Sequence, residues 1–451
     1  FKGMRSQDYL EVIRLGDGVI SVRPTIARLL SSLLTISSGA SIGREGGMVQ
    51  LSALVASSIG RIFSFSRPQL RLLVACGAAA GMASAYNTPL GGALFVAEVV
   101  MQSLAIDALG PLVVSALVAT LTIRHWIGMS PIFTSSEFNA APDFLLLPLL
   151  GLAVFAGLLT PLFLWILEQA RALFRWMRLP LPVSLALGGL VVGFISLDAP
   201  GVWGNGHAVV ETLLSQHPAL DWVLALLALK ILATAASVGS GAIGGVFTPT
   251  LLVGAAVGWL YCAGLQILVP GIGIDTVTYA ALGMGAFLAG ATHAPVMAIV
   301  MIFEMTLDSN LLLPLIMVTI ISRYLSAMIR PASVYSQALG DIQSRLPYFM
   351  HVADLQVKPG SVVTMDISAD KLSDMFCFST LQHIWVVDQQ GYYQGQVSLQ
   401  AMKHFLGYDA LKQLSGVMVF MEDDLPHLYP EMALTDVFSV FATVASEKLP
   451  V

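Results

Sequence analysis

The stretch "AYNTPLGGALFVAE" at residues 85–98 returns in altered form as "ATHAPVMAIVMIFE" at residues 291–304. Both segments carry Ala, Pro and Glu at the same spacing, and at the same offset Gly77 falls on Gly283. Membrane repeats joined by an odd number of crossings have inverted topology, with a binding site between the halves formed by the ends of broken helices. Chance similarity in a chain rich in glycine and alanine is the alternative explanation.

Composition identifies the chain as a membrane protein. Of its 451 residues, 56% are hydrophobic and 11% are charged, against about 25% charged residues in soluble domains. Several apolar stretches are long enough to cross a bilayer, some only if tilted or broken. They cover 88–123, 143–167, 181–197, 222–239, 245–270 and 278–303. The sequence therefore predicts an all-α polytopic membrane protein with broken helices.

The charge divides the chain into two parts. Residues 1–351 contain 17 Lys+Arg and 16 Asp+Glu, a net charge of +1, whereas residues 352–451 contain 5 and 12, a net charge of −7. An acidic second part is typical of a soluble domain and argues against a nucleic-acid partner. In it, residues 383–406 predict a strand, a turn at Gly391, a second strand and a helix. We expect a small α/β module after about residue 350.

One long segment indicates the orientation in the membrane. Residues 145–178 predict a single long, tilted helix that ends in Arg171, Arg175 and Arg178. By the positive-inside rule this end is cytoplasmic. The polar segment 130–143 would then lie outside, and the acidic tail would be cytoplasmic.

The segment "GSGAIGGVFTPTLL" (239–252) places four glycines within seven residues, directly before an apolar helical run. The first amides of a helix have no internal partners and lie at the positive end of its dipole, so they attract anions. Such partial charges bind a small anion weakly enough to let it leave again. The alternative is a glycine-rich contact between helices.

The segment "SIGREGGMVQ" (41–50) repeats this loop-then-helix pattern in the first half of the chain. If the two helix starts converge, Glu45 lies at the mouth of an anion site. Its carboxylate can occupy that site, and it leaves the path open when it is protonated or swung aside. The alternative is a charge pair of Arg44 with Glu45, although adjacent helical residues rarely face each other.

"GREGG" (43–47), "GSGAIGGVFTP" (239–249) and Tyr335 in "ASVYSQAL" resemble the CLC chloride channel/transporter family. The resemblance covers roughly residues 9–340 and includes residues 76–98 and 293–306. It implies an inverted-repeat fold with broken helices and a homodimer in the lipid bilayer, with one chloride pathway in each subunit.

The resemblance also assigns roles by position. Glu45 matches the gating glutamate, Val246 and Phe247 match the pair whose amides bind the central chloride, and Tyr335 matches the tyrosine that contacts this ion from the cytoplasmic side. The full set of expected chloride-binding residues is Gly43, Arg44, Gly46, Val246, Phe247 and Tyr335.

The chain departs from the family near its start. Family members usually carry "GSGIP" upstream, with a serine that contacts the anion. Counting without gaps places Met4 at that serine, and a slip of one or two residues would place Ser6 there, so the inner ligand stays open. A methionine here resembles fluoride-selective relatives, whereas residues 239–249 resemble the chloride branch.

The second departure concerns protons. Proton-coupled relatives generally have a second glutamate directly after the one matched by Glu98, and here that position is Val99. A proton that crosses a membrane interior needs ionisable or wet relay groups. Val99 therefore favours a passive chloride channel, with Cl⁻/H⁺ antiport as the alternative and fluoride transport as a third option. We expect Glu98 and Glu304, at equivalent positions of the repeat, to cap or pack helices.

The tail is similar to the CBS domains often attached to CLC proteins. We therefore expect a CLC transmembrane domain at 1–350, without the family's first helices, and a cytoplasmic CBS-like region at 351–451 whose second repeat is incomplete. Ala401 replaces an aspartate common in nucleotide-binding CBS modules, which makes nucleotide binding doubtful. A bacterial inner membrane is the expected location.

Other function classes fit the chain poorly. A membrane-embedded enzyme needs a nucleophile–base pair or a metal motif, and the sequence has no HExxH, no convincing Ser/His pair and no Asp-rich loop. The three cysteines lack metal-ligand spacing. We therefore expect no enzyme activity, no metal and no cofactor. A sensor built around the tail would leave both glycine-rich motifs without a purpose.

Overall fold

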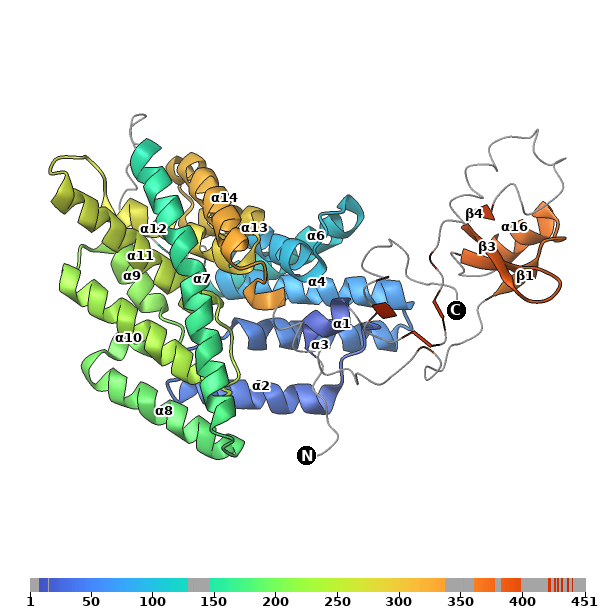
Figure 1. The fold of residues 1–451 in the computed structure, drawn as a ribbon, viewed down its shortest axis with the longest axis horizontal. Coiled ribbons are helices and arrows are strands. Elements are labelled where there is room, and N and C mark those ends of the chain that lie inside the picture. The colour runs from blue at the N-terminus through green and yellow to red at the C-terminus, as the bar shows by residue number, and fades with distance from the viewer. Residues whose placement is uncertain are drawn as a thin grey trace. The chain divides into compact units, whose positions relative to one another are not determined.

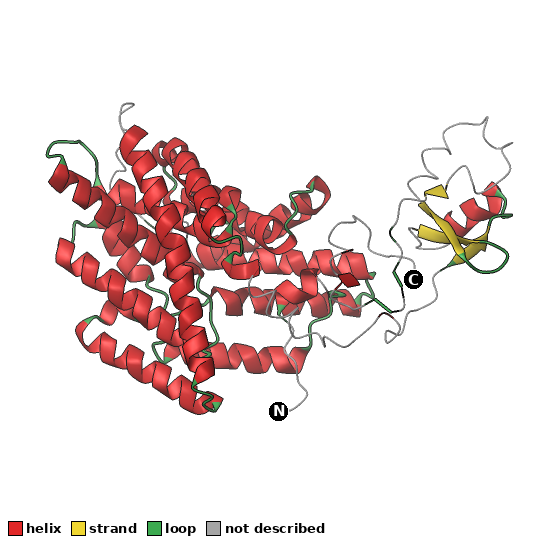
Figure 2. Ribbon diagram, in the orientation of Figure 1, coloured by secondary structure: helices red, strands yellow, loops and turns green. Residues whose placement is uncertain are grey.

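The computed structural model describes residues 8–14, 16–128, 133, 146–336, 352, 361–377, 383–398, 421–422 and scattered positions between 426 and 440. Met4, Ser6 and Ala401 lie outside the described residues. The chain divides into two compact units, residues 1–342 and 343–451. Among the described residues the first unit is helical, and the strands β1–β4 belong to the second (Figure 2).

The helices of the first unit are drawn in Figure 1. In chain order they are α1 (Tyr9–Arg14), α2 (Val22–Ser37), α3 (Glu45–Ile62), α4 (Arg67–Tyr86), α5 (Pro89–Leu94), the π-helix η1 (Phe95–Met101), α6 (Ile106–Ile127), α7 (Leu146–Trp176), α8 (Leu181–Asp198), the 3-10 turn η2 (Pro200–Val202), α9 (His207–Ser215), α10 (Leu220–Gly239), α11 (Phe247–Leu268), α12 (Thr276–Thr292), α13 (Pro295–Thr306), the 3-10 turn η3 (Ser309–Leu311) and α14 (Leu312–Ile329).

Long apolar helices confirm the prediction of a multi-pass membrane protein. In the described part of the chain, six segments are long and apolar enough to cross a bilayer: Ile106–Trp126, Leu146–Trp176, Leu181–Asp198, Leu220–Gly239, Phe247–Leu268 and Ser309–Ile329. The last of these was missing from the predicted stretches. Helix α7 confirms the predicted long helix, and its 31 residues exceed the roughly 20 that a bilayer requires. It packs against α10, α12 and α14 (Figure 1).

One break falls inside the predicted apolar stretch 278–303, and its counterpart directly precedes the stretch 88–123. The chain turns at Asn87 (φ 52°) before α5 and at His293 (φ 60°) before α13. These left-handed residues occupy equivalent positions of the repeat, and each is followed after one residue by a proline that begins a helix. The same local structure therefore recurs in both halves, and chance similarity does not explain the repeat.

The two repeated glutamates cap each other's helices. Glu98 at the end of the first segment accepts the Met297 N–H at 2.7 Å, at the start of α13. Glu304 at the end of the second accepts the N–H groups of Leu90 at 3.0 Å and Gly91 at 2.7 Å, at the start of α5. A carboxylate is stabilised at a helix N-terminus because unpaired amides and the positive dipole end lie there. The predicted structural role of both glutamates is confirmed.

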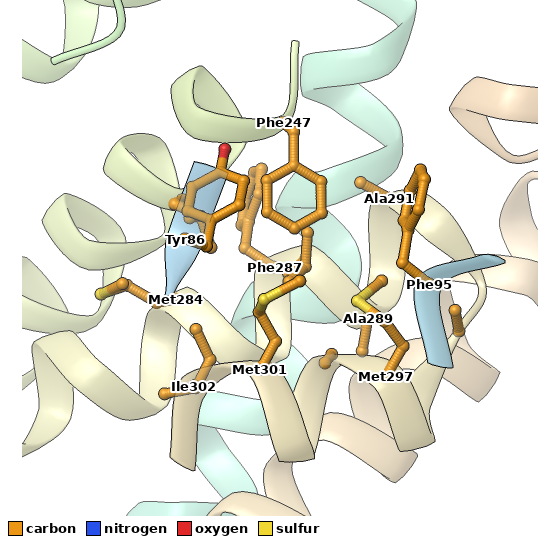
Figure 3. Packing of buried hydrophobic residues seen from close by; sticks show 14 of the residues in the cluster. Tyr86, Phe95, Phe247, Met284, Phe287, Ala289, Ala291, Met297, Met301 and Ile302 are labelled. Atoms are coloured by element: carbon orange, nitrogen blue, oxygen red, sulfur yellow. The ribbon is translucent and has the colours of Figure 1, made fainter. Parts of the chain in front are cut away.

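The core of the first unit lies around α12, which is buried along its whole length. Helices α11 and α12 approach closely through small residues, since a side chain at Gly283 would come within 2.8 Å of the Gly258 Cα. Close contact of this kind is typical of membrane helices. Figure 3 shows the neighbouring apolar cluster, in which Met297, Met301 and Ile302 of α13 lie close to Phe95 and Phe247.

The second unit contains a four-stranded sheet in the order β1 (Val362–Thr364), β2 (His383–Val387), β3 (Tyr393–Ser398), β4 (Met421–Glu422), with helix α16 (Ala369–Cys377). Strands β1 and β2 are parallel, and β2 and β3 form an antiparallel pair. Gly391 adopts φ 90° in the turn between them, so the predicted strand–turn–strand is confirmed. The helix predicted after it lies outside the described residues.

Candidate anion-binding site

The two glycine-rich loops meet. The Gly43 N–H donates to the Gly245 carbonyl at 2.6 Å, and the Gly245 N–H donates to the Gly43 carbonyl at 2.8 Å, which forms an isolated antiparallel bridge. Nearby, the Ser41 N–H donates to Ser237 Oγ at 3.0 Å. These bonds hold the starts of α3 and α11 beside each other, as the loop-then-helix patterns predicted.

Glycine is required in these loops by the space that the Glu45 carboxyl occupies. A Cβ built on Gly43 would collide with that carboxyl, and one built on Gly245 would lie 2.6 Å from Glu45 Oε2. Neither position is a simple helix–helix contact. The carboxyl therefore lies between the two glycine loops, where the amides of both helix starts are concentrated.

Glu45 is the first residue of α3 and only 4% exposed. Its Oε1 atom accepts hydrogen bonds from the Tyr86 hydroxyl at 2.6 Å and from Thr248 Oγ1. Its Oε2 atom has no hydrogen-bond partner among the described residues. An ionised group placed here is stabilised by the positive ends of two helices. The carboxylate thus lies here as a bound anion would, with hydrogen-bond partners at one of its two oxygens.

Arg44 does not neutralise Glu45. Arg44 is exposed, whereas Glu45 is buried. The ion pairs found within the described segments join Arg28 to Asp8 and Arg330 to Glu168. The alternative of an Arg44–Glu45 charge pair therefore does not explain the burial of the carboxylate.

A cavity of about 290 Å³ extends from the carboxyl. It reaches the ion pair of Arg28 with Asp8, in which the nitrogen and oxygen are 2.8 Å apart. Its wall brings together five of the predicted site residues: Glu45, Gly46, Val246, Phe247 and Tyr335. Gly43 and Arg44 are not part of this wall. The Tyr335 ring packs edge-on against Phe95, with ring centroids 5.5 Å apart.

Three site residues were missed from the sequence. Tyr9 of α1 lines the same cavity, whereas Tyr86 and Thr248 donate directly to Glu45. The signal available was a hydroxyl in otherwise apolar sequence: Tyr86 ends α4 directly before the Asn87 turn, and Thr248 follows Phe247 in the glycine-rich motif.

Val99 lies in η1 and is 4% exposed. Its carbonyl accepts a hydrogen bond from the Arg14 guanidinium at 2.8 Å, and the Val100 carbonyl accepts another at 2.5 Å. The side chain belongs to the main hydrophobic core. The position where proton-coupled relatives carry a glutamate is thus packed with apolar atoms.

Comparison with known proteins gives consistent matches. The profile of the family described as voltage gated chloride channel matches residues 2–327. This chain is similar to a protein of Ralstonia nicotianae named "Putative chloride channel protein ClcB-like", with 48% identity over 350 residues that cover 76% of this chain and 81% of that one. It is 41% identical over 333 residues to the voltage-gated ClC-type chloride channel ClcB of Salmonella typhi, covering 73% and 79% of the two chains.

Two solved structures have a similar fold. A slow cyanobacterial Cl⁻/H⁺ antiporter matches with a TM-score of 0.68 and 24% identity, over 75% of this chain and 80% of that one. A CLC-type fluoride/proton antiporter matches with a TM-score of 0.61 and 23% identity, over 72% and 80%. At these identities the likeness concerns the fold alone.

Proposed function

We propose, from the premise that this chain belongs to the voltage gated chloride channel (CLC) family, that it is a channel through which chloride moves passively and that Glu45 is its gate. The chain is a multi-pass membrane protein of that family. The channel mechanism, the assignment of the gate and the choice of chloride are the proposal.

The observation that carries the proposal is the position of the Glu45 carboxyl between the starts of α3 and α11. The same features that stabilise this carboxylate would stabilise a chloride ion: the unpaired amides and the dipoles of the two helix starts. Chloride and the carboxylate would therefore compete for one place. The cavity below it, lined by Val246, Phe247 and Tyr335, would hold the ion on the inner side of the gate.

Passive conduction is favoured over exchange by the surroundings of Val99. Proton transfer requires an ionisable or hydrated relay, and Val99 is buried in the apolar core. The second candidate is Cl⁻/H⁺ antiport, because a cyanobacterial Cl⁻/H⁺ antiporter has a similar fold. Fluoride transport is a third candidate, because a CLC-type fluoride/proton antiporter also has a similar fold.

The assembly and location are part of the same proposal. We infer a homodimer with one pathway in each subunit, placed in a bacterial inner membrane with the tail in the cytoplasm. The positive residues Arg171, Arg175 and Arg178 at the end of α7 and just after it support this orientation. The tail is proposed to be a CBS-like region, with nucleotide binding doubtful.

The decisive experiment replaces the gate carboxyl with its neutral analogue. The protonated fraction of a mostly ionised carboxyl changes about tenfold for each pH unit, so chloride efflux from proteoliposomes should depend on pH in the unmodified protein. Glu45→Gln should give efflux that is faster at neutral pH and independent of pH. Glu211→Gln, at an exposed position of α9, is the matched control and should behave like the unmodified protein.

Two outcomes would contradict the proposal. An unchanged rate and pH response in Glu45→Gln would remove Glu45 from the gate. Proton uptake driven by a chloride gradient, measured with a pH-sensitive dye in the same liposomes, would replace the channel with an antiporter. A strong preference for fluoride in competition assays would replace the ion.

A further inference from the structure

We propose that the hydroxyls of Tyr86 and Thr248 form a latch that holds the Glu45 carboxyl in the anion path and determines how readily the gate opens. This inference rests on the proposed function, since it assigns positioning residues to the same gate. Both hydroxyls belong to positions that the sequence motifs left without a role.

The latch is built from three segments far apart in the chain. Tyr86 ends α4, Glu45 begins α3 and Thr248 is the second residue of α11. The Tyr86 hydroxyl donates to Glu45 Oε1 at 2.6 Å, and Thr248 Oγ1 donates to the same atom. All three residues are at least 95% buried. A buried hydroxyl is costly to leave without a partner, so these donors stabilise the carboxyl at this point.

The Tyr86 ring is fixed by its apolar neighbours. It packs against Phe247 with ring centroids 5.1 Å apart, and Figure 3 shows the two rings side by side above Met301 and Ile302. The hydroxyl lies at the end of a ring that has little freedom to turn away. The donor is therefore preorganised, and the mobile partner is the Glu45 side chain.

The latch holds the carboxyl in both protonation states. The Tyr86 and Thr248 oxygens are also 2.6 Å from each other, so three oxygens form a triangle. When the carboxyl is ionised, two hydroxyl protons can fill only two of the three edges. A proton on the carboxyl fills the third edge. Hydrogen bonds to a neutral acceptor are weaker than those to a charged one, so protonation loosens the latch, and opening then requires the carboxyl to leave both hydroxyls.

Other ionisable groups surround the carboxyl at longer range. Tyr9 and Tyr335 lie on the wall of the same cavity, Lys230 of α10 donates to the carbonyls of Val202 and Gly204, and Arg44 precedes the gate in the chain. The direct side-chain hydrogen bonds to Oε1 come from Tyr86 and Thr248. Removing one of these should therefore act on the gate more strongly than changing the distant groups.

The test removes one hydroxyl at a time and keeps the shape of the side chain. A hydrogen bond to a charged acceptor is strong enough that its loss should change the ratio of open to closed gates roughly tenfold or more. Chloride efflux at pH 7 should therefore rise in Tyr86→Phe and in Thr248→Val, up to the rate of Glu45→Gln. Tyr279→Phe is the control, because this buried hydroxyl has no partner within the described part of the chain, and its efflux should be unchanged.

A double-mutant comparison separates a latch from a general effect on the pore. In a Glu45→Ala background, which offers the hydroxyls no carboxyl, Tyr86→Phe should have no further effect on efflux. An equal acceleration in both backgrounds would overturn the latch, as would unchanged efflux in Tyr86→Phe when Glu45→Gln is fast. If Glu45→Gln itself has no effect, the proposed function fails. Should Tyr86→Phe not fold, Thr248→Val measured in the same two backgrounds decides.

Discussion

Three glutamates in this membrane domain place their carboxyl groups at helix starts, but these carboxyl groups are held in two different ways. Glu98 and Glu304 are each bound through both carboxylate oxygens by backbone N–H groups of a helix in the other half of the chain. Glu45 is bound through one oxygen by two side-chain hydroxyls, and its other oxygen has no partner in the described part of the structure.

The difference separates a structural carboxylate from a movable one. Backbone donors are fixed by the helix that carries them, so a carboxylate with both oxygens bound to them has little to gain by moving. Hydroxyl donors can rotate and can accept other partners. A carboxylate with one free oxygen at a site suited to any anion can be replaced there. The same chemical group therefore holds a helix start in place at Glu98 and Glu304, whereas at Glu45 it can be displaced, as the proposed gate requires.

The largest expected effect is on stability, and it comes from changing one of the two carboxylates that cap a helix in the other half of the chain. In Glu304→Gln, an NH₂ group replaces one of the two oxygens that accept from Leu90 and Gly91, which leaves one of these N–H groups facing another donor. We expect a loss of about 2 kcal/mol in the free energy of unfolding, seen as a lower midpoint of thermal unfolding in detergent. Glu45→Gln should lose much less. Equal losses in the two variants would contradict the distinction between them.

The next effect comes from crowding the movable carboxyl. Gly43→Ala places a Cβ where the Glu45 carboxyl lies, and the backbone tolerates alanine because Gly43 is not among the residues with positive φ. We expect chloride efflux to lose most of its pH dependence, which should be about tenfold for each pH unit in the unmodified protein. Gly110→Ala, where a Cβ meets nothing within 4 Å, is the control. Full pH dependence in Gly43→Ala would show that the carboxyl acts from elsewhere.

The smallest effect is expected at the neighbouring charge. Arg44 is exposed and forms no ion pair with Glu45, and exposed charges contribute little because water and salt screen them. Arg44→Gln should change the efflux rate by less than about twofold, and the difference should shrink when the salt concentration is raised. A larger change that persists in high salt would make Arg44 part of the site.

Much of the fold could be predicted because short, contiguous sequence patterns determine it. The repeat at 85–98 and 291–304, the glycine loops and the long apolar runs each produce their structure where they occur. The crossing at 309–329 was missed although it is as apolar as the segments Leu181–Asp198 and Phe247–Leu268, which were predicted. The meeting of the two glycine loops followed from the repeat and not from either loop alone.

The latch could not be predicted, for a physical reason. Thr248 donates to a residue 203 positions away, and Tyr86 contacts Thr248 across 162 positions. No spacing rule connects residues on three separate helices. A single hydroxyl in an apolar run has many possible partners, and only the packing of α3, α4 and α11 selects one.

The paired hydrogen bonds between Gly43 and Gly245 have a consequence for how the proposed gate can work. They tie the starts of α3 and α11, one from each half of the repeat, together beside the Glu45 carboxyl, so neither helix start can shift without carrying the other along. The two joined helix starts thus form a rigid frame, and opening of the proposed gate is left to the rotation of the Glu45 side chain between them. A gate of this kind needs no rearrangement of the helices. Its opening rate depends on how long the Glu45 carboxyl stays between the two glycine loops.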